Sequence, residues 1–386
     1  MVTLQVNNKK IGFERVEWSG TENQCSRQIA FSIPNNPYDK NFKGTTKIKL
    51  GDLTRLYNDK KRIFVGTVTS REKSAEIGTC EYTSTDFMSH LLKSNGTYKF
   101  KNTSPERITI KVCNDAGVKT KNLADSRIGI EKMFFEDQCI YDIIVKAYRK
   151  AKTKTKKKYM PVMDGTKVSV VEKGKSSGVV LRQGIDIISA SYTDTTDDMI
   201  NKVVIYNDKL KRLGQVQNKN NITKYGIYQG IYTKEKGVDA KAAARNLLVG
   251  ITKEASIEAI GNINAVSGKS IKIEDKATGL IGTFYISSDT HTFENGIHTM
   301  TLELVWKNVM ETGAETSSLG KDDKTKKNLT NASKCFYLSN STVYHSSTNC
   351  SACKGKKTSK STVLKMKKIK NKKGKRKYRP CSRCWR

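Results

Sequence analysis

The stretch that decides the fold is Gly279–Trp306, GLIGTFYISSDTHTFENGIHTMTLELVW. Apolar and polar side chains alternate on both sides of Asn295-Gly296. Period-two alternation is the pattern of a strand with two different faces, and an Asn-Gly pair between two such runs is typical of a tight hairpin turn. The stretch therefore predicts two antiparallel strands around a turn at Glu294–Gly296.

A weaker copy of this pattern lies near the start of the chain. Ile63–Ser70 and Ile77–Tyr82 are two strand-like runs separated by a polar interval. The resemblance between the two stretches indicates two copies of one β module. Residues 1–85 as a whole favour a small barrel or sandwich, with short strands at Thr3–Val6, Gly12–Trp18, Gln28–Ile33, Thr46–Leu50, Arg62–Ser70 and Gly78–Tyr82.

The pattern changes after about residue 84. Ser104 is a suitable N-cap with Pro105 at the first helical position, which predicts a helix through Ala116. A second helix fits Cys139–Lys150, with Ile140, Ile143, Ile144 and Ala147 on its inward side. A short helical turn fits Asp86–Leu92, and strands return at Tyr159–Met163 and Lys167–Glu172. These elements predict a mixed α/β segment.

The second β module begins near Ile185 and ends with the hairpin. One helix interrupts it: Asp239 serves as N-cap, Ala240–Val249 as the body and Gly250 as the C-cap. The expected strands before the hairpin are Ile185–Tyr192, Lys202–Tyr206, Leu213–Gln217, Gly226–Tyr232, Ala255–Ile260 and Ser270–Glu274.

The net charge of +34 is concentrated at the C-terminus. Lys and Arg number 71 against 37 Asp and Glu, and 354–386 alone holds sixteen Lys and Arg and no acid. The charge is therefore local and does not indicate a DNA-binding surface over the whole chain. No apolar run reaches about 18 residues, so we expect no membrane span. The first residues lack the apolar core of a signal peptide, so we expect an unsecreted chain.

Two C-x-x-C pairs near the C-terminus predict a Zn²⁺ site. Cys350 and Cys353 form the first pair, and Cys381 and Cys384 form the second. Each pair can present two thiolates to one ion, and a unit of about 50 residues with so few apolar side chains needs such a cross-link. Disulfides or free thiols are the alternatives, but clustered cysteines in an unsecreted chain favour metal.

The same region resembles the small zinc module of the Ada DNA-repair protein. The resemblance lies in Tyr344-His345, then Cys350, then Tyr378-Arg379-Pro380 before the second C-x-x-C pair. It implies the ligand set His345, Cys350, Cys381 and Cys384. The gap between His345 and Cys350 is slightly longer than in Ada, so Cys353 stays an alternative fourth ligand.

The sequence offers no catalytic motif. The sequence contains no Walker loop, no G-x-S-x-G, no H-E-x-x-H and no G-x-G-x-x-G. His291 and His298 should meet across the predicted hairpin near Asp289, but histidines on a strand pair are more often structural than metal-binding or catalytic. We therefore predict no catalytic residues and a protein that is not an enzyme.

Much of the chain resembles the XkdQ-type baseplate hub family of contractile phage tails. The resemblance lies in DIISASYTDTTDDMINKVVIYND (186–208), KYGIYQGIY (224–232), DAKAAARNLL (239–248) and the hairpin, and more loosely in VTLQVNNKKIGFERVEWSG (2–20) and RIFVGTVTS (62–70). It implies a homotrimer in which each chain gives two tail-tube-like β-barrels. Six barrels would then continue a six-fold tail tube above and meet a trimeric spike below.

The expected fold is mainly β with an α+β insertion. Its parts are a first tube-like barrel (1–85), an α/β insertion domain (86–180), a second tube-like barrel (181–307), a flexible linker (308–333) and a basic zinc-binding module (334–386). Expected partners are the tail tube protein, the spike protein and the tape-measure protein in the lumen, in the baseplate of a phage tail or of a tail-like bacteriocin assembled in the bacterial cytoplasm.

Three interpretations of the basic C-terminus stay open: a solvated surface, contact with DNA or another polyanion, and docking of an acidic protein. Two alternative functions also stay open. One is a nucleic-acid-binding zinc protein, and the other is a hub with associated cell-wall hydrolase activity.

Overall fold

The computed structural model describes residues 1–23, 25–35, 47–73, 78–235 and 238–310, and beyond them the backbone of four short strands. The chain divides into two compact units, residues 1–317 and 318–386. Each unit is described by itself. Among the described residues, no helix has the length and the apolar character needed to cross a bilayer.

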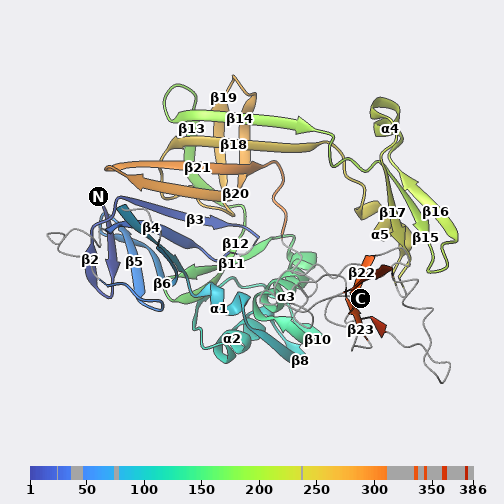
Figure 1. Cartoon of the computed structure of the whole chain (residues 1–386), viewed down its shortest axis with the longest axis horizontal. Helices are drawn as coiled ribbons and strands as arrows, with labels where there is room; N and C mark the ends of the chain where they lie inside the picture. The colour runs from blue at the N-terminus through green and yellow to red at the C-terminus, as the bar shows by residue number, and fades with distance from the viewer. Residues whose placement is uncertain are drawn as a thin grey trace. The chain divides into compact units, whose positions relative to one another are not determined.

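Thirteen strands of the first unit form one sheet (Figure 1). Its main path runs β14-β18-β21-β20-β3-β4-β7-β6-β5-β1-β2, and β19 joins β13 to β20. The strands are β1 (Val2–Val6), β2 (Lys9–Ile11), β3 (Arg15–Thr21), β4 (Gln28–Asn35), β5 (Leu53–Asn58), β6 (Lys61–Lys73), β7 (Gly78–Thr85), β13 (Ser176–Arg182), β14 (Ile187–Thr195), β18 (Thr252–Ile260), β19 (Ser270–Asp275), β20 (Leu280–Glu294) and β21 (Ile297–Val305).

A strand near the N-terminus, β3, pairs with β20 of the C-terminal hairpin of the first unit. β3 pairs antiparallel with β20 from Arg15↔Glu294 to Thr21↔Ser288, so strands more than 260 residues apart become neighbours. Two apolar cores lie along the sheet. The first contains Leu4, Val16, Ile29, Leu56 and Phe64, and the second contains Ile257, Ile271, Ile286, Leu302 and Leu304.

The hairpin predicted from Asn295-Gly296 is confirmed. β20 and β21 pair from Tyr285↔Val305 to Glu294↔Ile297. Asn295 and Gly296 have φ values of 50° and 78°. Two successive positive φ values are those of a type I′ turn, whose twist matches the twist of the flanking strands.

A β-bulge at Ser287 changes which side chains of β20 face inward. The register of β20 against β21 shifts between Ile286 and Ser288. Before the shift Phe284 and Ile286 are buried in the second core, whereas after it Asp289, His291 and Phe293 are buried. Phe293 packs in the first core. One strand therefore serves both cores, because the extra residue moves the inward face from even to odd positions.

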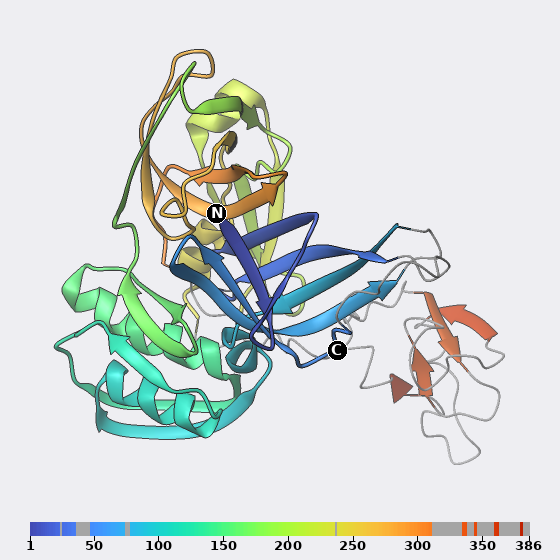
Figure 2. The same cartoon turned by 90° about the vertical axis from the view of Figure 1, so that its left-hand side faces the viewer.

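A mixed α/β segment forms the third core of the first unit (Figure 2). β8 pairs with β10, and β11-β12-β9 form a separate three-stranded sheet. The helices α2 and α3 pack against each other and against these strands. The elements are α1 (Met88–Leu92), β8 (Asn95–Thr103), α2 (Pro105–Asp115), β9 (Thr120–Leu123), β10 (Ile130–Cys139), α3 (Ile140–Thr155), β11 (Tyr159–Asp164) and β12 (Lys167–Glu172).

The helix signals of this segment are confirmed. The Ser104 side chain accepts a hydrogen bond from the Arg107 backbone, and Pro105 is the first residue of α2. Ile140, Ile143, Ile144 and Ala147 on α3 are all buried. α3 continues past the predicted end at Lys150 and stops at Lys156, which has a left-handed backbone.

A small module interrupts the β14–β18 pair, whose last register partners are Thr195↔Thr252. Its sheet has the order β16-β15-β17, and α5 packs against all three strands (Figure 1). The elements are β15 (Lys202–Tyr206), β16 (Arg212–Gln217), α4 (Lys219–Tyr225), β17 (Gln229–Thr233) and α5 (Ala240–Asn246). The module has its own core of Val203, Ile205, Val216 and Ala244.

Several predicted elements were wrong in detail. Leu50 and the described residues just before it are not a strand, and the strand is β5, Leu53–Asn58. The helix predicted to Val249 ends at Asn246, because Leu247 already serves as its C-cap and Val249 bridges to Ile200. The sequence placed β15, β16 and β17 among the strands of the second β module, whereas they form a sheet of their own.

The second unit contains a four-stranded sheet of order β24-β22-β23-β25. Its strands are β22 (Lys334–Tyr337), β23 (Val343–His345), β24 (Ser359–Thr362) and β25 (Arg379–Pro380). The predicted mainly β fold with mixed α/β elements is thus confirmed at this level. The closed barrels and the zinc module stay predictions.

Candidate functional site

The first unit contains a buried polar network where its cores meet. We call it the junction network and define it as Glu22, Arg27, Lys173, Asp289, His291 and His298. Glu22 and Arg27 belong to the connection between β3 and β4, the two histidines and Asp289 to the hairpin, and Lys173 follows β12. Cys25 of the same connection packs in the α/β core. The network therefore lies between the two cores along the sheet and the core of the α/β segment.

The centre of the junction network is the ion pair of Arg27 with Asp289. Arg27 Nη1 donates to Asp289 Oδ1 at 3.0 Å, and Nη2 donates to Oδ2. The Asp289 side chain is fully buried, and its Oδ1 also accepts from Ser267 N at 2.6 Å. The Arg27 guanidinium lies 3.9 Å from the centre of the Trp18 ring. This bidentate, stacked geometry suits arginine and not lysine.

The surroundings of Asp289 determine its charge. Burial alone raises the pKa of this carboxyl, but the Arg27 charge, a hydrogen bond from His291 and the hydrogen bonds of Arg27 outweigh burial. The pKa is therefore held well below its usual range, and Asp289 is an anion in the folded protein.

His291 lies between Asp289 and His298 and contacts both. His291 Nε2 lies 3.1 Å from Ala265 O and 3.4 Å from Asp289 Oδ2, and both oxygens are acceptors. His291 Nε2 therefore carries a proton, and His291 Nδ1 lies 3.1 Å from His298 Nε2. Burial, together with the nearby His291, lowers the pKa of His298 to about 4. The His298 ring is therefore neutral at pH 7.

A second ion pair ties the α/β segment to the sheet. Lys173 Nζ lies 2.8 Å from Glu22 Oε2, and both side chains are almost fully buried. Lys173 also donates to the backbone oxygen of Val309, and Glu22 N donates to Ser287 O at 2.8 Å. This buried ion pair therefore links the end of β12 to the connection between β3 and β4.

The centre of the junction network is closed to solvent. The central carboxylate and His291 have no exposed surface, so no substrate can reach them. The predicted meeting of His291 and His298 across the hairpin is confirmed. Among the described residues, no group of three or more His, Cys, Asp or Glu is arranged to hold a metal ion.

The predicted zinc ligands belong to the second unit. Cys350, Cys353, Cys381 and Cys384 lie outside the described residues, and His345 is described only as the last backbone position of β23. β23 pairs in parallel with β25, with Tyr344 opposite Pro380. In the sequence, His345 and Cys381 each follow one of these paired residues.

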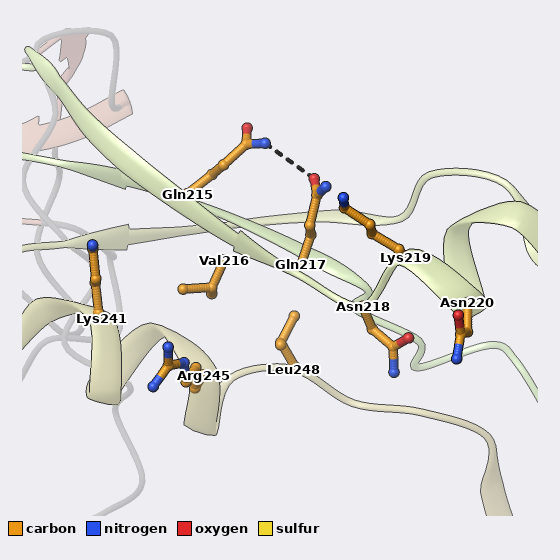
Figure 3. A pocket seen from close by; sticks show the side chains of 9 residues that line it. All are labelled: Gln215, Val216, Gln217, Asn218, Lys219, Asn220, Lys241, Arg245 and Leu248. Atoms are coloured by element: carbon orange, nitrogen blue, oxygen red, sulfur yellow. Dashed lines mark hydrogen bonds between the residues drawn. The ribbon is translucent and has the colours of Figure 1, made fainter.

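The small module carries a pocket of about 540 Å³ along β16 and α5. Val216 and Leu248 form its apolar floor, and three cations lie around it: Lys219, Lys241 and Arg245 (Figure 3). The remaining lining residues are amides, namely Gln215, Gln217, Asn218 and Asn220. We call this pocket, with these nine lining residues, the basic groove.

Comparison with known proteins assigns the chain to a family. The family model described as YQBQ-like matches residues 16–305. The chain belongs to the YQBQ-like family. Two relatives from Bacillus subtilis (strain 168) are similar over most of their length. They are the uncharacterized protein YqbQ, 27% identical over 78% of this chain and 94% of the relative, and the phage-like element PBSX protein XkdQ, 26% identical with the same coverage.

Solved structures share the fold of this YQBQ-like chain. The 43 kDa tail protein of prophage MuSo2 from Shewanella oneidensis has a TM-score of 0.60 at 15% identity, over 79% of this chain and 97% of that one. A tail protein from Neisseria meningitidis MC58 has a TM-score of 0.55 at 14% identity, over 78% and 95%. The resemblance to XkdQ-type proteins noted in the sequence is therefore confirmed.

Sequence reasoning found half of the junction network. The alternation of the hairpin pointed to Asp289, His291 and His298. Arg27, Glu22 and Lys173 were missed because Arg27 is 262 residues from Asp289 and Glu22 is 151 residues from Lys173 in the sequence. No local pattern marks these three residues, since they precede or follow strands in stretches rich in polar side chains.

Proposed function

We propose that this chain is a structural protein of a contractile phage tail or tail-like particle, and that three copies form the hub of its baseplate. The observation that carries the proposal is the single sheet with two cores, whose path ends at β14 and β2 without a further strand among the described residues. An unpaired edge is a site for strand pairing with another chain. The names of the relatives and of the solved tail proteins support the setting.

The surface next to β14 supports assembly through this edge. Ile188, Ile260 and Ile297 are each more than half exposed. Ile260 is opposite Thr299 in the β18–β21 pair, so Ile297, two residues along, shares its face. β14 has nine residues and a single charged one, Asp194, near its end. Soluble monomers usually protect such an edge with charges or proline, so these features favour a neighbouring chain here.

The proposal predicts a native mass of about 130 kDa, three times the 43.3 kDa of one chain. Ile188→Lys should weaken the trimer, because a charge at the edge opposes burial. Ile110→Lys is the matched control, since Ile110 is 41% exposed on α2, outside the sheet. A chain that stays single at high concentration, measured by native mass spectrometry, contradicts the proposal.

We also propose that 334–386 is a zinc-binding module with Cys350, Cys381 and Cys384 as ligands. The fourth ligand is His345 or Cys353. The pairing of Tyr344 with Pro380 supports His345, because the next residue on each side is a proposed ligand. Metal analysis should give about one zinc per chain. His345→Ala and Cys353→Ala, compared with each other, identify the fourth ligand, because only one of them should release zinc.

In this setting the trimer would join the tail tube protein above to the spike protein below, with the tape-measure protein in its lumen. The zinc module would lie near the lumen or spike junction and contact one of these proteins or DNA. Deletion of residues 334–386 should leave the trimer intact. DNA affinity that falls steeply with salt and disappears with this deletion would locate polyanion binding in the module. Loss of trimers on deletion would instead make the module part of the scaffold.

A further inference from the structure

The small module carries a pocket, the basic groove, that has no part in the proposed trimer contact. We propose that the basic groove accepts an acidic protein segment in extended conformation, which adds as a strand to the edge of β16 and directs its carboxylates toward Lys241, Arg245 and Lys219. The proposal goes beyond the trimeric hub and does not depend on it.

The first support is the charge of the groove. Its lining contains three cations and no acid. Among the described residues, no carboxylate forms an ion pair with Lys219, Lys241 or Arg245, and all three side chains are exposed. The acid nearest in sequence, Asp239, accepts hydrogen bonds from Lys241 N at 2.9 Å and Ala242 N at 3.3 Å as the N-cap of α5. The groove therefore presents uncompensated positive charge, which selects an anionic partner.

The second support is the open edge of β16. The strand lies at the end of its sheet, and no other described strand pairs with its outer side. Four consecutive register pairs with β15, from Gln217↔Lys202 to Gly214↔Ile205, keep this part of the strand regular. Its single charge is Arg212, at the far end. An edge of this kind offers backbone N–H and C=O groups to an added strand, which a sugar–phosphate polymer cannot use in the same way.

The third support is how the lining side chains are arranged. Gln215 Nε2 donates to Gln217 Oε1 at 3.0 Å on one face of β16, whereas Val216 points to the face covered by α5 (Figure 3). Lys241 and Arg245 lie one helical turn apart on α5, which is close to the spacing of every second residue on a strand. A partner with acids at alternate positions therefore matches both cations. The apolar floor of Val216 and Leu248 accepts the carbon atoms of those side chains.

The test uses the full chain and a fluorescent six-residue peptide of alternating glutamate and threonine. We expect salt-dependent binding that Lys241→Gln with Arg245→Gln weakens about tenfold, since each lost ion pair is exposed. The matched control is Lys209→Gln with Lys211→Gln, two exposed lysines in the turn between β15 and β16, which should leave the affinity unchanged. Thermal unfolding of both double variants verifies that they are folded.

Two further probes separate strand addition from general attraction of anions. A peptide of the same charge with N-methyl groups on alternate amides should lose binding, because it cannot donate to the strand edge. Inorganic polyphosphate should compete poorly at the groove. Equal affinity of the methylated peptide, equal competition by polyphosphate, or peptide binding that the groove variant leaves unchanged overturns the proposal. The native mass of the groove variant should stay that of the parent chain, so this test and the trimer test fail independently.

Discussion

Removal of Arg27 should destabilise the first unit more than the loss of an ordinary side chain at its surface. In Arg27→Ala, Asp289 keeps the Ser267 N–H and loses both guanidinium donors while its side chain stays fully buried. Breaking one side of a buried ion pair costs about 3–5 kcal/mol, because the remaining charge is buried without its partner. The stacking of Arg27 on Trp18 is lost in the same substitution, so we expect about 4 kcal/mol in total.

Urea unfolding followed by Trp fluorescence measures this loss directly, because Trp18 contacts the substituted side chain. A loss of about 4 kcal/mol moves the midpoint by about 1 M or more. Lys111→Ala is the matched control, since its ion pair with Asp115 is exposed and its loss should leave the urea midpoint nearly unchanged.

A double variant tests the cause of the loss. Arg27→Met combined with Asp289→Leu removes both charges and replaces them with apolar side chains of similar size. It should recover much of the stability, because the cost in Arg27→Ala comes from the unpaired carboxylate and not from lost volume. A free energy of unfolding of Arg27→Ala that lies within about 1 kcal/mol of the parent value contradicts this role of the Arg27–Asp289 pair.

Three other predictions concern packing, pH and metal. Gly66→Ala should destabilise the first unit by at least about 2 kcal/mol, because a Cβ there would lie 2.3 Å from the Thr85 backbone oxygen. Gly12→Ala is the control, because a Cβ at Gly12 meets no atom within 4 Å. The urea midpoints of the two variants are compared. The folded-state pKa of His298 is depressed to about 4, so its contribution to stability should be present above about pH 6.5 and be lost as pH falls toward 4; unfolding curves of His298→Gln should lack this part of the pH dependence. Chelation of zinc, or Cys381→Ser, should unfold the C-terminal module, which limited proteolysis detects. The urea midpoint of the first unit should stay unchanged.

Two strong local signals predicted the local structure correctly. Asn295-Gly296 specified the turn because two positive φ values favour these residues, and Ser104-Pro105 specified the start of α2 because its cap is made within three residues. α4 was missed: Lys219–Tyr225 has no buried residue, so no apolar period marks it. Its cap is Asn218, whose side chain accepts from Asn221 N.

Long-range pairing was beyond the reach of the sequence. The two β units were expected to be separate, and nothing in Arg15–Thr21 shows that this strand pairs with the hairpin. The bulge at Ser287 was also missed. Strict alternation placed Asp289 on the same face as Ser287 and opposite Ile286, whereas the extra residue buries both Ile286 and Asp289. The metal prediction for the C-terminus stays a prediction.

The shared use of β20 limits how this protein can be divided. Phe293 completes the core of residues near the N-terminus, although it lies in the last hairpin of the first unit. A recombinant fragment that stops before the hairpin would leave β3 without its partner β20. A fragment that begins after β7 would leave Phe293 without the first core and Asp289 without Arg27. Exchange of segments between members of the YQBQ-like family should therefore keep both ends of the first unit from the same parent. Deletion of the single residue Ser287 would reverse the two faces of β20 after the bulge and turn Asp289 and Phe293 away from their present partners.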